Sequence, residues 1–337
     1  MSNLADILQI DIGEEIVIDN DKPTSWADLK NYLGPIKFDW HPWLPKGLLT
    51  ILASESGTGK SALALRLAGC YLINLPLPDN SQFEGEQGYV LWAEAEAAQA
   101  VNLERAVDWK YPIDQILTPF NDPTMDINLE DINHRNALVE KARRPEVKLI
   151  IVDSLSGANT RRKESDTEIM RLTRWLATLA RDTQKSVLLT HHLRKKGMFD
   201  TDDVELDRLR GSSAIQQHAK VIWAIDTPDI TNKENKRLKI IKNNLAKLPN
   251  PLGMTISDQG VGFGEAPKAA RVETQTDKAA DILISLLTKQ PMKANDIMDE
   301  IEQAGISWHT AKIAKEKIKI VSIKKVDGWY WSLPIHE

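Results

Sequence analysis

The sequence has 337 residues, of which 42% are hydrophobic and 27% charged, and its 43 Lys and Arg stand against 48 Asp and Glu, giving a formal net charge of −5. This length accommodates one large α/β domain and a smaller one, and the composition is ordinary for a soluble globular protein. The negative net charge excludes a generally basic surface, so any binding of nucleic acid must come from local basic patches.

The sequence lacks the features of secreted and membrane proteins. Its single cysteine, Cys70, has no possible intramolecular disulfide partner and is expected to be a small core residue. No apolar run approaches the roughly 18 residues of a membrane span. The first residues lack the basic start and apolar stretch of a signal peptide. We therefore expect a cytoplasmic protein with no membrane partner.

The first 30 residues are acidic and weakly patterned. The helical spacing of Leu4, Ile7 and Leu8 leaves two interpretations open: a short arm that docks on the core or on a neighbouring subunit, or a disordered tail. The stretch from Trp40 to Gly47 either forms a lip near a nucleotide base or packs its aromatic side chains in the core.

A phosphate-binding loop is predicted at residues 54–61. The apolar run 47–53 precedes the letters SESGTGKS and a helix-forming run follows them, which is the strand–loop–helix context that a P-loop requires. Its backbone N–H groups would point at a phosphate, Lys60 would reach the β- and γ-phosphates, and Ser61 would ligate Mg²⁺. Ser54 stands where Gly is usual and tolerates a tight turn less freely. We expect the nucleotide contacts to come from Ser56, Gly57, Thr58, Gly59, Lys60 and Ser61.

Two further strands end in carboxylates. Residues 88–93 read as a buried strand that leads to Glu94 and Glu96, which would lie on the same side of an extended chain. A further strand is expected at 147–154, where the four apolar residues 149–152 run into Asp153, the Walker B pattern in which an Asp at a strand end holds Mg²⁺.

The remaining pattern predicts a mostly parallel α/β sheet. Further strands are expected at 186–190, 221–225 and 237–242, with a helix at 169–180. The first of these strands leads into His191 and His192. Because ligands bind at the carboxyl ends of parallel strands, we expect Glu96, Asp153 and His192 to share one site.

A second, smaller domain is predicted after a polar linker at 265–277. Helices are expected at 279–287, 293–304 and 308–319, the last with Ser307 as its N-cap, and a hairpin with an Asp-Gly turn at 320–334. This order is that of a winged helix-turn-helix. The predicted organisation is therefore an arm (1–30), an α/β ATPase domain (31–264), the linker, and a winged-helix domain (278–337).

These motifs resemble the RecA-like ATPases of the RepA-type plasmid and phage helicase group, with DnaB-like replicative helicases as more distant kin. The resemblance rests on residues 47–61, the strand that leads to Glu96, residues 149–154, and residues 187–195 with Arg-Gly-Ser-Ser at 210–213. The tail around Gly328 to Pro334 is a weaker second match. The resemblance implies a RecA fold, ATP hydrolysis with Mg²⁺, a ring or filament of subunits, and single-stranded DNA near the centre.

The resemblance also implies roles for single residues. Glu96 matches the carboxylate that polarises the attacking water, with Glu94 as the competing assignment, and His192 matches the γ-phosphate sensor. The family's basic finger, a Lys-x-Arg pattern that acts in the next subunit's site, matches Lys242-Asn243-Asn244 here. The Lys is therefore present and the Arg is not, and Lys247 is a possible substitute.

Contacts with DNA are expected from two loops and from the C-terminal domain. The loops run from Asn159 to Lys163 and from Arg194 to Arg210, and each is either a phosphate-binding or a solvated charged loop. Residues 304–326 hold six Lys against Glu316, a basic third helix and wing that would suit duplex DNA or a protein partner. The residues expected to contact DNA are Arg161, Arg162, Lys163, Arg194, Lys195, Lys312 and Lys315.

We therefore predict an ATP-hydrolysing, DNA-dependent motor, a hexameric replicative helicase of a plasmid, phage or other mobile element that acts on single-stranded DNA and has a possible replication partner protein. The alternative is a non-translocating RecA-fold ATPase that loads or regulates another replication or recombination protein. A P-loop kinase is disfavoured because the sequence shows no arginine-rich lid.

Overall fold

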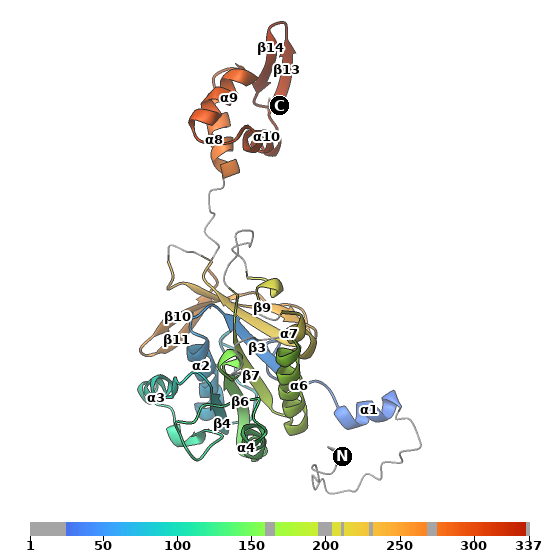
Figure 1. The fold of residues 1–337 in the computed structure, drawn as a ribbon, viewed down its shortest axis with the longest axis vertical. Coiled ribbons are helices and arrows are strands. Elements are labelled where there is room, and N and C mark those ends of the chain that lie inside the picture. Colours follow the sequence, from blue (N-terminus) through green and yellow to red (C-terminus); the bar gives the residue numbers. More distant parts are fainter. Residues whose placement is uncertain are drawn as a thin grey trace. The chain divides into compact units, whose positions relative to one another are not determined.

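The structure, a computed structural model, describes residues 25–158, 166–194, 204–209, 212–228, 232–267 and 275–334. Its contacts divide the chain into two compact units, Met1–Pro267 and Lys268–Glu337, each of which is described by itself (Figure 1). In the part of the chain that is described, no helix has both the length and the apolar character that crossing a membrane requires.

The first unit is built on a nine-stranded sheet with the order β11-β10-β9-β8-β3-β7-β6-β4-β5. Six strands are parallel to one another, and the three at one edge continue the sheet antiparallel. The parallel strands are β3 (Leu49–Ser54), β4 (Tyr89–Glu94), β5 (Ile116–Leu117), β6 (Val147–Asp153), β7 (Ser186–His192) and β8 (Val221–Asp226); the antiparallel ones are β9 (Lys236–Asn243), β10 (Leu252–Ser257) and β11 (Gly260–Glu265).

Helices cover both faces of this sheet (Figure 1). One apolar cluster contains side chains of α2 (Lys60–Ile73) and α3 (Gln99–Asp108). The other contains side chains of α4 (Ile132–Ala142), α5 (Leu155–Ala158), α6 (Asp166–Thr183) and α7 (Ser212–His218). Every residue of β3 and β8 is buried, which is why these strands read as continuous apolar runs instead of alternating patterns. The predicted α/β class with a mostly parallel sheet is confirmed.

The first unit also contains smaller elements. Helix α1 (Trp26–Leu33) begins with a capping box at Ser25, and β1 (Phe38–Trp40) pairs with β2 (Leu44–Pro45). Two 3₁₀ helices, η2 and η3, span Ile113–Gln115 and Leu206–Arg208. The aromatic side chains between Trp40 and Gly47 pack in the core: Trp40 stacks on Trp43 at 4.6 Å, and both rings meet the buried Trp223 edge-on. The interpretation of this stretch as a lip near a base is therefore wrong.

The second unit consists of three helices and a three-stranded sheet of order β12-β14-β13. Its elements are α8 (Gln275–Leu287), β12 (Met292–Lys293), α9 (Ala294–Gln303), α10 (Trp308–Lys317), β13 (Val321–Lys325) and β14 (Gly328–Ser332). The predicted N-cap is confirmed, because the Ser307 side chain accepts a hydrogen bond from the Thr310 backbone. Two details differ from the prediction. Helix α8 begins inside the range expected to be linker, and the hairpin loop is Val326–Asp327, since Gly328 already pairs with Lys325.

A buried carboxylate ties the first unit together. Asp39 on β1 accepts hydrogen bonds from the Tyr71 hydroxyl of α2 at 2.7 Å and from the Ser186 hydroxyl of β7 at 2.6 Å. All three side chains are buried, so the bonds form where water does not compete for them. The contact joins β1 to β7 and to α2, the helix that follows the P-loop.

We predict that Asp39→Ala lowers the free energy of unfolding by about 1–3 kcal/mol, because the buried Tyr71 hydroxyl loses its acceptor and the buried Ser186 hydroxyl keeps only the Pro45 carbonyl at 3.3 Å. Urea denaturation followed by tryptophan fluorescence measures the change. Asp114→Ala, which removes an exposed carboxylate from η2, is the matched control and should change stability little. Equal losses in the two variants would contradict the structural role given to Asp39.

Candidate nucleotide-binding site

The candidate site lies at the carboxyl edge of the parallel sheet. The P-loop follows β3, Glu94 ends β4, Asp153 ends β6 and His192 ends β7. In the register of the sheet, Ser54 lies opposite His192 and Glu94 lies opposite Asp153. The expectation that these strand ends converge is confirmed by their position, since neighbouring parallel strands end at the same edge.

The P-loop takes its shape from two glycines. Gly57 and Gly59 have φ angles of 75° and 103°, a region that residues with a Cβ atom rarely adopt. Ser54 does not share this conformation. Its buried hydroxyl donates to the Glu55 carbonyl at 2.9 Å and accepts from the Thr58 hydroxyl. The loop therefore does not need glycine at position 54, and the serine joins its two ends.

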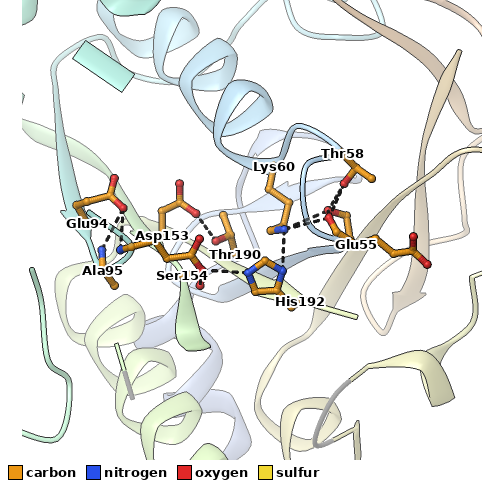
Figure 2. Close-up of polar contacts among 11 residues, drawn as sticks. Glu55, Thr58, Lys60, Glu94, Ala95, Asp153, Ser154, Thr190 and His192 are labelled. Carbon is orange, nitrogen blue, oxygen red and sulfur yellow. Dashed lines mark hydrogen bonds and ion pairs between the residues drawn. The ribbon is translucent and has the colours of Figure 1, made fainter. Parts of the chain in front are cut away.

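Lys60 is buried at the first turn of α2, and three acceptors surround its ammonium. The Nζ atom lies 3.3 Å from the Ser54 hydroxyl, 3.3 Å from the Glu55 carbonyl and 3.2 Å from His192 Nδ1 (Figure 2). Burial lowers the pKa of Lys60 below its ordinary value, and the charge of Asp153 opposes this shift. The ammonium is thus held at the mouth of the loop, where a phosphate group would meet it.

His192 joins Lys60 to Glu96. Its Nε2 atom lies 3.0 Å from Glu96 Oε1, and the Ser154 hydroxyl donates to the same oxygen (Figure 2). An ammonium can only donate, so Nδ1 accepts from Lys60 and Nε2 carries the hydrogen that is donated to the carboxylate. The hydrogen bond from His192 lowers the pKa of Glu96 to about 2. The Glu96 carboxylate is therefore ionised at neutral pH.

Glu94 has a different environment from Glu96. The strand β4 ends at Glu94, so the expectation that both side chains lie on one side of an extended chain is wrong. The buried Glu94 carboxylate accepts from the Trp92 indole, the Asn102 amide and two backbone N–H groups, and burial raises its pKa. These contacts indicate that Glu94 shapes the turn that carries Glu96.

The residues present fit a magnesium ion bound together with phosphates. Asp153 is buried, and its Oδ1 atom accepts from the Thr190 hydroxyl at 2.5 Å (Figure 2). Its Oδ2 atom has no hydrogen-bond partner among the described residues, and a carboxylate oxygen is the ligand that Mg²⁺ prefers. The described residues contain no group of three or more His, Cys, Asp or Glu arranged to hold a metal. Mg²⁺ commonly takes only one or two protein ligands beside substrate phosphates, and Ser61 and Asp153 remain our assignment.

Close packing sets the position of Glu96. Gly157 in α5 lies against the backbone of residue 95, and a Cβ atom built on it would be 2.2 Å from the Ala95 carbonyl oxygen and 3.0 Å from Glu96 Cγ. Any larger residue at 157 would displace the turn that carries Glu96. The tight approach therefore needs glycine.

The structure adds Arg208, which sequence reasoning missed. The Arg208 side chain is 4% exposed, and its Nη2 atom donates to Glu55 Oε1 in the P-loop at 2.7 Å and to the Arg194 carbonyl at 3.2 Å. Arg194 follows β7 closely, and the Leu193 backbone N–H donates to the Ser54 carbonyl at 3.0 Å. Arg208 thus binds the start of the P-loop to the chain that leaves β7. In the sequence Arg208 stands between Asp207 and Leu209, and nothing in that pattern indicates its contact with the P-loop.

The structure brings none of the other predicted DNA-binding side chains into contact with Lys60, His192 or Glu96 among the described residues of the first unit. Arg161, Arg162, Lys163 and Lys195 are outside the described residues. Arg194 pairs with the Asp207 carboxylate at 3.2 Å. Lys312 and Lys315 belong to the second unit.

Lys242 lies at the opposite edge of the sheet. It pairs with Ile222 near the start of β8, and its ammonium donates to the carbonyls of Gln216 and Ala219, the latter at 3.0 Å. Burial lowers its pKa. The structure does not bring Lys242 to the Glu96 cluster of its own chain, and Lys247 is exposed.

Comparisons with known proteins are consistent with this geometry. A family described as an AAA domain matches residues 19–198. The chain is similar to the crystal structure of the RadB recombinase, with 14% identity, 70% of this chain and 96% of that chain covered, and a TM-score of 0.46. It is also similar to a DnaB-like replicative helicase whose structure was described together with its interactions with primase. The identity is 14%, 72% of this chain and 65% of that chain are covered, and the TM-score is 0.51. No curated protein sequence matches significantly. The first unit has a RecA-like P-loop fold.

We predict that Glu96→Gln lowers ATP turnover by about 10²–10⁴-fold and leaves ATP binding intact, because it removes the ionised carboxylate without touching the P-loop. Glu94→Gln, the matched control, should lower the melting temperature, and its turnover should fall much less than that of Glu96→Gln. Steady-state phosphate release and calorimetric ATP binding measure the two effects. Loss of turnover in Glu94→Gln with normal turnover in Glu96→Gln would reverse the assignment.

We predict that Arg208→Gln weakens ATP binding by about tenfold, because breaking the charge-assisted hydrogen bond to the exposed Glu55 carboxylate frees the start of the P-loop. Glu55→Gln should weaken it as well, and the double variant should be no weaker than Arg208→Gln alone, since the pair is lost only once. Equilibrium titration with a fluorescent ATP analogue gives the three affinities. Strictly additive effects would show that Arg208 and Glu55 act independently.

Proposed function

The chain belongs to the AAA-domain family, and on that premise we propose that it is an ATP-hydrolysing, DNA-dependent motor of the RepA-type plasmid and phage helicase group. The proposal is carried by one observation: the hydrogen-bonded chain Lys60–His192–Glu96 joins a P-loop lysine to an ionised carboxylate. A protein that only bound nucleotide would have no need of that carboxylate, because the P-loop alone provides the phosphate contacts.

The residues divide the chemistry between them. Glu96 accepts a hydrogen bond from the attacking water and orients it, which an ionised carboxylate with a pKa of about 2 can do at neutral pH. Lys60 stabilises the charge that builds on the transferring phosphoryl group. His192 contacts both, so a change at the phosphate reaches Glu96 through one side chain. Mg²⁺, when bound by Ser61 and Asp153, would neutralise phosphate charge.

We assign DNA binding to both units. Single-stranded DNA would bind the basic loops 159–163 and 194–210 of a hexameric ring, and the second unit, as a winged helix-turn-helix, would contact DNA through Lys312 and Lys315. In such a ring Lys242 or Lys247 would act in a neighbouring subunit's site. The position of Lys242 far from its own Glu96 cluster supports a role in trans. A mobile-element replication system with a partner protein is the setting that this assignment implies.

A second candidate is a non-translocating ATPase that loads or regulates another replication or recombination protein. It is favoured by the contacts of Lys242, whose ammonium is held by the carbonyls of Gln216 and Ala219 in its own chain. Lys242 would have to break these two hydrogen bonds before it could enter the site of a neighbouring subunit. Hydrolysis would then be slow or would depend on a partner.

We predict that single-stranded DNA raises the ATPase rate at least several-fold, and that Lys60→Ala and removal of Mg²⁺ by EDTA each abolish this activity. The protein should also displace a strand from a forked duplex. Phosphate release measures the ATPase rate, a gel-based assay measures unwinding, and mass photometry tests whether the protein forms the proposed hexamer. DNA-dependent binding of ATP with no unwinding of any fork would favour the loader, and an ATPase indifferent to DNA would remove both proposals.

A further inference from the structure

The hairpin of the second unit exposes side chains that proteins usually bury. Trp329 on β14 is 55% exposed, and Val326 at the hairpin loop is fully exposed. All five residues of β13 are exposed as well. Single exposed apolar residues are normal on protein surfaces, so Trp329 indicates a binding surface only together with the charged side chains around it.

Lysines accompany the aromatic rings on one face of this hairpin. In the strand register Lys324 lies opposite Trp329, and Ser322 lies opposite Trp331. The Lys324 ammonium is 5.8 Å from the Trp329 ring. Residues two apart on a strand point to the same side, so these two pairs share a face.

Toward α10 this face is covered, because Trp331 is buried in the core of the second unit. Lys315 lies 4.8 Å from the Trp331 ring and donates to the Ser322 hydroxyl at 2.5 Å. Lys312 lies 5.9 Å from Trp308, which stacks on Trp331 at 4.9 Å. We call this surface the lysine–tryptophan strip; it consists of Lys312, Lys315, Lys324 and Trp329.

The charge of the strip favours a polyanion. In the described part of the second unit, no carboxylate lies within ion-pair distance of its three lysines. The acid nearest in sequence to Trp329, Asp327, is paired with Lys293 at 2.7 Å. Lysines without carboxylate partners attract phosphates. Because the chain as a whole is negatively charged, this attraction is confined to the strip.

The chemistry of the strip favours unpaired bases over a duplex. Of the residues that read base edges bidentately in the major groove, helix α10 contains Lys but no Arg, Asn or Gln. Its Lys317 is paired with Asp277 at 2.7 Å, and Ile313 is exposed on its surface. An exposed indole, in contrast, offers a platform on which a single-stranded base can stack, and bases inside a duplex cannot reach it.

We propose that the lysine–tryptophan strip binds single-stranded DNA, with one base stacked on Trp329 and with Lys312 and Lys324 on the flanking phosphates. The proposal rests on the DNA-binding part of the proposed function and deepens it. It gives the second unit a preference for single strands that is independent of ATP.

The test measures the affinity of the full chain, without nucleotide, for a labelled oligothymidylate and for a duplex of equal length, by fluorescence anisotropy. Trp329→Ala should weaken single-strand binding by about tenfold and leave duplex binding unchanged, because a stacked base is lost. Trp329→Phe should restore most of the affinity. Lys324→Gln should weaken single-strand binding and lower its salt dependence, whereas Trp329→Ala should not change the salt dependence.

Two matched controls remove the same groups elsewhere. Lys289→Gln removes an exposed lysine of the same unit, and Trp26→Ala removes an exposed tryptophan of the first unit. Equal losses on duplex and single strand, an effect of Lys289→Gln equal to that of Lys324→Gln, or no loss with Trp329→Ala would each overturn the proposal. The last outcome would indicate a protein partner. The strip and the motor can fail separately, because a selective loss with Trp329→Ala does not depend on ATPase activity.

Discussion

The two hydrogen bonds of the His192 imidazole are the constraint on which the candidate site depends. One ring nitrogen accepts from Lys60 and the other donates to Glu96, so a single tautomer connects the P-loop to the carboxylate. The arrangement requires that β7 end at the same edge as β3. It also requires that residue 192 point toward the site, and since neighbouring strand residues point to opposite faces, His191 is buried on the other side. A change of register by one residue would exchange the two histidines.

The strands that end at this edge lie in the centre of the sheet, and β3 and β8 are buried on both faces. Burial explains why the five strands at 88–93, 147–154, 186–190, 221–225 and 237–242 could be predicted from apolar runs, and each observed strand begins and ends within two residues of the predicted bounds. The hairpin β10–β11 could not be predicted in the same way. Three of the six residues of β11 are glycine, and the strand lies at the rim of the sheet, where the apolar pattern is weak. Strand β5 has only two residues, both half-buried.

The site was predictable to the same extent as the strands. Lys60, Asp153, Glu96 and His192 stand at strand ends or in the P-loop, so their convergence followed from topology. Arg208 was not predictable, because its role depends on the path by which the chain returns from β7 to α7, and no local pattern encodes that path. The distinction between Glu94 and Glu96 also needed the structure. It depends on where β4 ends, and strand ends are the least certain part of a sequence-based assignment.

The close approach at Gly157 has a consequence for how this family of sequences can change over time. Selection at this position favours the absence of a side chain. A Cβ atom there would collide with the Ala95 carbonyl and displace the turn that carries Glu96. Such a residue carries no functional group and would not be recognised as part of a site by its chemistry. Substitution at position 157 is therefore expected to be as restricted as substitution at the charged residues of the site. In a descendant that had already lost Glu96, a larger side chain at 157 would no longer affect activity.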